Sequence, residues 1–250
     1  MARLSVNVNK VATLRNSRGG QVPSVIEAVR ICLAAGAPGI TVHPRADRRH
    51  ISPEDVREIA GELAPLRDRV EFNIEGDPRQ ELLTLVAEVR PQQCTLVPVQ
   101  PGEITSAAGW SPDSVTGTST AQMQSIVGEL QAAGVRVSLF VDADPGAVEW
   151  AARMGADRIE LYTEPFARAY IDGGWKLEQS FERFARAARQ AHDLDLGVNA
   201  GHDLDLENLL LFRTLPFLDE VSIGHAIISR ALFVGLKAVV EEYLDVLAGR

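Results

Sequence analysis

Eight short runs rich in Val, Ile and Leu recur along the chain, and they constrain its fold more than any other feature. They lie at 4–8, 39–43, 70–74, 94–99, 136–142, 158–163, 196–200 and 220–224. Near-continuous β-branched content over this length is typical of strands in a parallel sheet that is covered on both faces. Segments with helical spacing lie between the runs, as in 145–154, where Ala147, Ala151 and Met154 recur at steps of four and three residues.

The alternation of strands and helices predicts the architecture. Alternating β and α elements form a parallel sheet, and eight such units within 250 residues match the usual size of a closed barrel. An open doubly wound sheet would carry a Gly-rich phosphate turn after an early strand, but the first strand leads into Asn9-Lys10. We therefore predict a single (β/α)8 TIM barrel domain of the α/β class over residues 1–250, with an extra short helix within 164–180.

Charge and cysteine content exclude several classes of protein. A net charge of -9 argues against a general nucleic-acid binder, although a few local cations suffice to bind phosphorylated metabolites. The two cysteines, Cys32 and Cys94, have no metal-ligand spacing and predict no disulfide framework. The first residues lack the apolar core of a secretory signal, and charged residues interrupt the most apolar tail, from Ala226 onward. We expect a cytoplasmic protein without membrane contact.

Polar side chains gather where the predicted strands end, which is where barrel enzymes build their active sites. They are Asn7, His43, Glu71 with Glu75 just after it, Thr105, Asp142, Glu160, His202, Gly224 and His225. Glu71 and Glu160 lie inside apolar runs, and a carboxylate directed into a barrel costs several kcal/mol unless it is paired. Desolvation also raises the pKa of such a carboxyl group toward the range used in acid–base catalysis. We therefore expect both glutamates to take part in chemistry.

Other interpretations of these residues are structural or metal-binding. A histidine near a strand end is more often a packing residue than a catalyst, and Asp142 is a common type of helix cap. Four of the 5 histidines, namely His43, His50, His202 and His225, fall at or after strand ends and are potential zinc or manganese ligands. No His-x-His pair or close His/Asp cluster occurs on any one strand, so we predict no metal.

Two segments are candidates for phosphate binding. One is the basic loop at 15–20 after the first strand, and the other is the turn at 223–227, where the eighth strand leads into a helix. The second is more specific, because free backbone N–H groups and the helix dipole attract anions. Barrels also bind phosphate frequently after strands seven and eight.

Six stretches resemble the pyridoxine 5′-phosphate synthase family of vitamin B6 biosynthesis. They are VATLRNSRGG (11–20), GITVHPRADRRHI (39–51), VEFNIE (70–75), VSLFVDAD (137–144), VNAGHDL (198–204) and IGHAIISRAL (223–232). Together they extend over nearly the whole chain.

The resemblance implies an activity. Enzymes of this family condense 3-amino-2-oxopropyl phosphate with 1-deoxy-D-xylulose 5-phosphate, and release pyridoxine 5′-phosphate, inorganic phosphate and water. The resemblance further implies that no metal or organic cofactor is used and that the barrels assemble as a homo-octamer. The expected partners are therefore small phosphorylated substrates and copies of the chain itself.

The resemblance also assigns roles to individual residues. It makes His43 a proton acceptor that works with Glu71, His202 a proton donor, and Glu160 a stabiliser of a transition state. Residues implied to hold deoxyxylulose phosphate are Arg45, His50 and Thr105. Residues implied to hold the aminoketone phosphate are Asn7, Arg18, Gly224 and His225.

The chain departs from the family pattern at its phosphate-binding edge. Asn9 and Lys10 stand where the family commonly has Asp-His, and Asp203 stands where it commonly has Gly. We include all three among the expected substrate-binding residues, since Lys10 still offers a cation to a phosphate.

Two alternative functions follow from the same residues. One is a barrel lyase or epimerase that acts on another phosphorylated carbonyl compound; none of the eight runs contains the Lys that a Schiff-base aldolase needs. The other is a ligand-binding or scaffold protein, which gives no reason for acid–base residues to converge at the strand ends.

Overall fold

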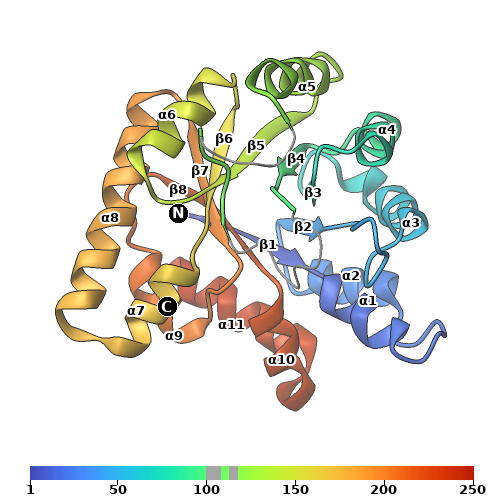
Figure 1. The fold of residues 1–250 in the computed structure, drawn as a ribbon. Coiled ribbons are helices and arrows are strands. Elements are labelled where there is room, and N and C mark those ends of the chain that lie inside the picture. Colours follow the sequence, from blue (N-terminus) through green and yellow to red (C-terminus); the bar gives the residue numbers. More distant parts are fainter. Residues whose placement is uncertain (100–107, 113–117) are drawn as a thin grey trace.

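Eight parallel strands close into a barrel in the computed structural model, which describes residues 1–99, 108–112 and 118–250 (Figure 1). Each strand pairs with its neighbours in chain order, and β8 pairs with β1. The strands are β1 (Arg3–Asn7), β2 (Gly39–Val42), β3 (Glu71–Gly76), β4 (Gln93–Leu96), β5 (Arg136–Val141), β6 (Arg158–Leu161), β7 (Gly197–Gly201) and β8 (Leu218–Ile223). The predicted (β/α)8 barrel is confirmed.

Helices surround the strands (Figure 1). They are α1 (Asn9–Asn16), α2 (Val25–Ala34), α3 (Pro53–Leu63), η1 (Ala64–Leu66), α4 (Gln80–Val89), α5 (Thr120–Ala132), α6 (Pro145–Arg153), α7 (Glu164–Asp172), α8 (Gly174–Asp193), α9 (Leu206–Phe212), α10 (His225–Val234) and α11 (Leu236–Ala248). The extra helix predicted within 164–180 is α7, which Gly173 separates from α8 with a φ of 68°. Within the described ranges, no helix is both long and apolar enough to cross a bilayer.

Local sequence signals explain where several helices begin and end. Ser52 opens α3 with a capping box, in which its hydroxyl accepts the N–H of Asp55 and Asp55 accepts the N–H of Ser52. Such a cap stabilises a helix by about 1 kcal/mol. Gly36, Gly134 and Gly155 follow α2, α5 and α6 with positive φ, as expected for helix ends that turn left-handed before the next strand.

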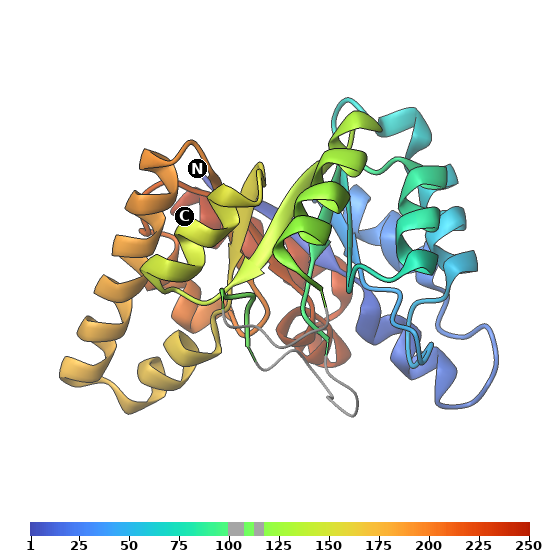
Figure 2. The same cartoon turned by 45° about the horizontal axis from the view of Figure 1, so that its top comes forward.

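The interior of the barrel is polar at its middle level. The hydroxyls of Ser5 and Thr41 lie 2.6 Å apart, and the amide of Asn73 donates to Thr41 and accepts from Thr95. All four side chains are buried. Buried polar groups need partners, and here they find them across β1 to β4. This polar layer lies between the two ends of the barrel. At one of these ends lie the segments that follow β1, β6 and β8, including α1, α7 and α10 (Figure 2).

Candidate active site

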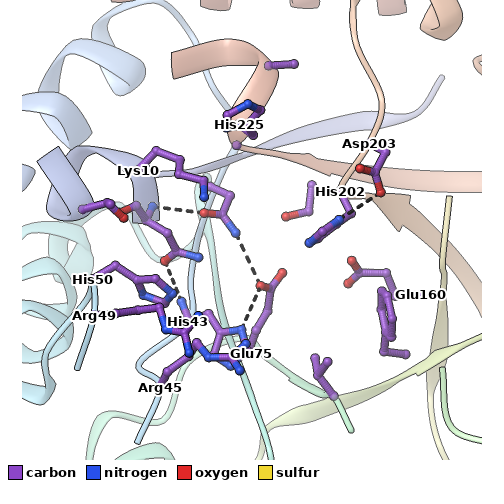
Figure 3. A pocket seen from close by; sticks show the side chains of 18 of the residues that line it. Lys10, His43, Arg45, Arg49, His50, Glu75, Glu160, His202, Asp203 and His225 are labelled. Atoms are coloured by element: carbon purple, nitrogen blue, oxygen red, sulfur yellow. Dashed lines mark hydrogen bonds and ion pairs between the residues drawn. The ribbon is translucent and has the colours of Figure 1, made fainter. Parts of the chain in front are cut away.

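A cavity of about 570 Å³ opens at the carboxyl-terminal ends of the strands (Figure 3). Its charged and titratable lining residues are Lys10, His43, Arg45, Arg49, His50, Glu75, Glu160, His202, Asp203, Asp205 and His225. Side chains that follow β1 and β2 supply the cations Lys10, Arg45 and Arg49. On the other side lie Glu160 and Asp203, and Glu75 lies between (Figure 3). The cavity therefore offers an anion-binding wall opposite an acidic wall.

Glu75 and His43 meet at the floor of the cavity. Oε2 of Glu75 lies 3.9 Å from Nδ1 of His43 and accepts a hydrogen bond from Nδ2 of Asn7 at 3.4 Å. Burial raises the pKa of Glu75 to about 8 and lowers the pKa of His43 well below its usual value, with His50 adding to the effect. Near neutral pH the pair is therefore a protonated carboxyl group beside a neutral imidazole, which can respectively donate and accept a proton.

Asn9 links the ends of the first two strands next to this pair. Its Oδ1 accepts the backbone N–H of His43 at 2.9 Å, and its own N–H donates to Oδ1 of Asn7 at 3.0 Å. The side-chain oxygen is thus engaged with the backbone that carries His43, although Asn9 also lines the cavity. An Asp at this position would present the same acceptor oxygen.

Glu160 and His202 lie on the side of the cavity opposite the cations Lys10 and Arg45 (Figure 3). Burial raises the pKa of Glu160 to about 8, and the repulsion that Glu160 and Glu75 would feel if both were ionised adds to the effect. Two buried atoms at the cavity, Oε2 of Glu160 and Nε2 of His43, have no hydrogen-bond partner among the residues that the structure describes. Buried polar atoms without partners are uncommon, and these two are available to a substrate.

The predicted phosphate turn lies at the edge of the cavity. β8 ends at Ile223 and α10 begins at His225, with Gly224 between them. A Cβ on Gly224 would lie 2.9 Å from the carbonyl oxygen of Asn7, so only glycine lets the strand turn into the helix so close to β1. Gly224, His225 and Ala226 all line the cavity, which brings the first N–H groups of α10 to an anion-binding position.

Most of the predicted site residues line the same cavity. They are Asn7, Asn9, Lys10, His43, Arg45, His50, Glu160, His202, Asp203, Gly224 and His225. Arg18 does not line it and is exposed in the turn after α1. Thr105 lies outside the described residues. No group of three or more His, Cys, Asp or Glu in the described part of the chain is arranged to hold a metal ion.

The prediction that Glu71 joins the active site is wrong. Glu71 begins β3, at the opposite end of the barrel, where its carboxylate pairs with Arg3 at 3.3 Å and with Arg136. Its place beside His43 is taken by Glu75. Both glutamates point to the same face of β3 because they are four residues apart on the strand. The position of each glutamate along the strand is the signal that could have identified Glu75. Active sites form at the carboxyl-terminal ends of barrel strands, and Glu75 is nearer to that end than Glu71. Arg49 and Asp205 also line the cavity and were not predicted.

Comparison with known proteins identifies the family of the chain. A family model described as "Pyridoxal phosphate biosynthesis protein PdxJ" matches residues 4–249. The chain belongs to the PdxJ family. The predicted family of vitamin B6 biosynthetic enzymes is thereby confirmed.

Curated relatives cover the whole length. A protein of Bacteroides thetaiotaomicron named "Pyridoxine 5'-phosphate synthase" is 50% identical over 248 residues, which cover 99% of this chain and 100% of the relative. A protein of Porphyromonas gingivalis with the same name is 47% identical over 249 residues, with 99% and 100% covered.

Solved structures of low sequence identity share the fold. Phosphoribosyl anthranilate isomerase from Thermotoga maritima is 14% identical with a TM-score of 0.62, and 100% of each chain is covered. 3-Hexulose-6-phosphate synthase from Salmonella typhimurium is 12% identical with a TM-score of 0.63, and 99% of each chain is covered. At this identity the likeness concerns the barrel alone.

Proposed function

We propose that this PdxJ-family chain is a pyridoxine 5′-phosphate synthase that condenses 3-amino-2-oxopropyl phosphate with 1-deoxy-D-xylulose 5-phosphate. The observation that carries the proposal is the cavity itself, where a cationic wall faces buried acid–base groups, in a chain that shares half its residues with relatives of that name. The reaction forms an imine, eliminates phosphate and closes a ring. Each step moves protons at a different atom of the substrate, so several acid–base groups around one cavity suit it.

The phosphate groups bind to the cationic side. Lys10 and Arg45 supply positive charge there, and charge-assisted hydrogen bonds to phosphate are stronger than neutral ones. The first turn of α10, opened by Gly224 and His225, supplies a second anion site from backbone N–H groups. Two separate phosphate positions suit two phosphorylated substrates whose carbon chains must meet between them.

Proton transfers divide between the two sides of the cavity. His43, neutral in its buried position, accepts a proton from the substrate, and the protonated Glu75 beside it returns one. A pair of groups whose pKa values are moved apart in this way can act as base and acid at one pH. His202 donates a proton from the opposite side, where the carboxyl group of Glu160 stabilises a transition state. Glu75 thus takes the role predicted for Glu71.

Three further properties stay predictions. Catalysis without a metal or organic cofactor and assembly as a homo-octamer come from the family resemblance, and a cytoplasmic location comes from the composition of the chain.

The direct test incubates the purified chain with both substrates and measures inorganic phosphate together with pyridoxine 5′-phosphate. Each substrate alone is the control. We expect product only when both are present. A folded protein that gives no product over roughly pH 6 to 9, the range in which these acid–base groups change protonation, would contradict the proposal. Turnover of a single phosphorylated ketose instead would support a lyase or epimerase.

A further inference from the structure

The side chains of two successive residues, His202 and Asp203, meet at the wall of the cavity. Nδ1 of His202 lies 3.0 Å from Oδ2 of Asp203 (Figure 3). Neighbours on an extended strand point to opposite faces, so this contact needs a special backbone. His202 supplies it with a φ of 62°, a left-handed conformation that is uncommon outside glycine. The sharp turn after β7 brings the carboxylate to the imidazole.

The backbone of Asp203 is fixed on both sides. Its N–H donates to Oγ1 of Thr163 at 3.3 Å, and its carbonyl oxygen accepts from Nδ2 of Asn208 at 3.1 Å. Asn208 itself belongs to the capping box that begins α9, in which it pairs with Asp205. The start of α9 and the segment that follows β6 therefore hold the backbone of Asp203 in place.

The backbone of His202 is fixed as well. Its N–H donates to the carbonyl oxygen of Ser222 at 3.1 Å. A Cβ on the preceding Gly201 would lie 2.0 Å from the same oxygen, so the end of β7 is pressed against β8. With both backbones held, the contact between the two side chains is a built feature of the wall rather than a chance meeting of surface groups.

A carboxylate on one ring nitrogen determines what the other can do. When Nδ1–H of an imidazole donates to a carboxylate, Nε2 becomes the nitrogen that gains and loses the proton. Other groups face this ring without engaging Nδ1: Tyr162 lies edge-on with ring centroids 6.4 Å apart, and Glu160 and His43 interact with it electrostatically. Among the described residues, Asp203 is the one whose side chain contacts Nδ1 of His202.

We propose that Asp203 is a positioning residue that holds His202 in the Nδ1–H tautomer and keeps Nε2 as its proton-exchanging atom. The kinetic part rests on the proposed function, whereas the tautomer does not. The assignment replaces the expectation that Asp203 binds substrate, because its carboxylate is committed to the imidazole. This role would also explain the carboxylate at position 203, where the family pattern commonly has Gly.

Nitrogen-15 NMR of the ligand-free protein tests the tautomer. The variant His202→Gln assigns the ring signals by their loss. In the native protein we expect a proton on Nδ1 of neutral His202. Asp203→Ala should shift the population toward the Nε2–H tautomer, while Asp203→Asn, which keeps an acceptor oxygen, should restore Nδ1–H. The same tautomer population in the native protein and in Asp203→Ala would overturn the proposal.

Steady-state kinetics then separate positioning from substrate contact. We expect Asp203→Ala to lower kcat roughly tenfold to hundredfold, less than the roughly 10⁴-fold loss at a buried catalytic triad, because both side chains are about a third exposed. KM should stay nearly constant, and Asp203→Asn should recover most of kcat. A higher KM with unchanged kcat would overturn the proposal in favour of a substrate contact.

A matched control uses Asp172→Ala, which removes a surface carboxylate that pairs with Lys176 on α7 and α8. It should leave both the tautomer and the kinetics unchanged. If the native chain shows no synthase activity, the proposed function fails while the NMR result still decides the role of Asp203.

Discussion

Glu71 and Glu75 share one face of β3, yet their carboxylates serve opposite ends of the barrel. Four residues of extended strand separate them by about 13 Å, with Asn73 of the polar layer between them. Glu71 is neutralised by Arg3 and Arg136, whereas Glu75 contacts Asn7 and His43 in the cavity. The same side-chain type is therefore a structural ion-pair partner at one end and an acid–base group at the other.

Replacing Glu75 should remove activity without unfolding the protein. Glu75→Gln keeps the hydrogen bond with Asn7 but can no longer exchange a proton, so we expect kcat to fall on the order of 10²- to 10⁴-fold. Circular dichroism and urea unfolding should show a folded protein at least as stable as the native one near pH 8, where the native carboxyl group begins to ionise. Activity within twofold of native would exclude Glu75 from proton transfer.

Glu71→Gln should give the reverse result. It removes the anion between two arginines whose side chains are 45% and 30% exposed. Water reaches both, so the cost should be about 1–3 kcal/mol, below that of breaking a fully buried pair. The free energy of unfolding measured in urea should fall by this amount, while kcat stays within about twofold because Glu71 is remote from the cavity. A loss of turnover at unchanged stability would return Glu71 to the mechanism.

Asn9 should contribute to catalysis through its side-chain oxygen, Oδ1, which accepts the backbone N–H of His43. Asn9→Ala removes the acceptor for the backbone N–H of His43, and the loss of about 1 kcal/mol of positioning energy should lower kcat roughly fivefold. Asn9→Asp keeps an acceptor at the same position and should retain most of kcat. Steady-state kinetics of both variants check this. If Asn9→Asp is as impaired as Asn9→Ala, the amide N–H₂ group is needed, and a direct substrate contact becomes the better explanation.

The charge of Lys10 should contribute to the binding of phosphorylated substrates. Lys10→Met keeps the length of the side chain without its charge, and we expect the Kd for the sugar phosphate to rise roughly tenfold. Isothermal titration calorimetry measures it. Lys237→Met, on the exposed surface of α11 where Lys237 pairs with Glu241, is the matched control and should bind as the native chain does. Equal affinities for the two variants would contradict a phosphate role for Lys10.

Stability should fall as the pH rises from about 5 to 8. Burial raises the pKa of Glu75, Glu160 and Glu220 from 4.5 to about 8. Between these values the folded chain retains protons that the unfolded chain releases, so the free energy of unfolding decreases with pH by at most about 1.4 kcal/mol per pH unit per group. Glu220→Gln, which is neutral at every pH, should lose less stability over this window.

Urea unfolding at about pH 5 and pH 8 measures the effect, since the two ends of the window bracket the titration. Glu241→Gln alters an exposed carboxylate on α11 and is the control. Identical losses in the native chain and in Glu220→Gln would show that Glu220 does not titrate in this window.

Strand positions follow from local sequence, whereas the order of side chains around the cavity does not. The runs of β-branched residues match all eight strands to within a few residues, because a strand buried on both faces must be apolar along its length. The predicted role of Glu71 is wrong because apolar sequence neighbours indicate only that a side chain is buried. They do not indicate at which end of the barrel it lies. The pairing of Arg3, Arg136 and Glu71 joins residues 65 and 68 positions apart.

The sequence by itself therefore determined the barrel, its family and most of the residues that line its cavity. Strand propensity, helix caps and motifs each depend on a few residues that are close together in the sequence. Only the tertiary structure decided that Glu75 replaces Glu71 beside His43, that Asn9 supports the backbone of His43, and that Asp203 turns toward His202. Each of these depends on closing the barrel. Closure fixes the depth of every inward side chain, and the left-handed turn at His202 sets the direction of its neighbour.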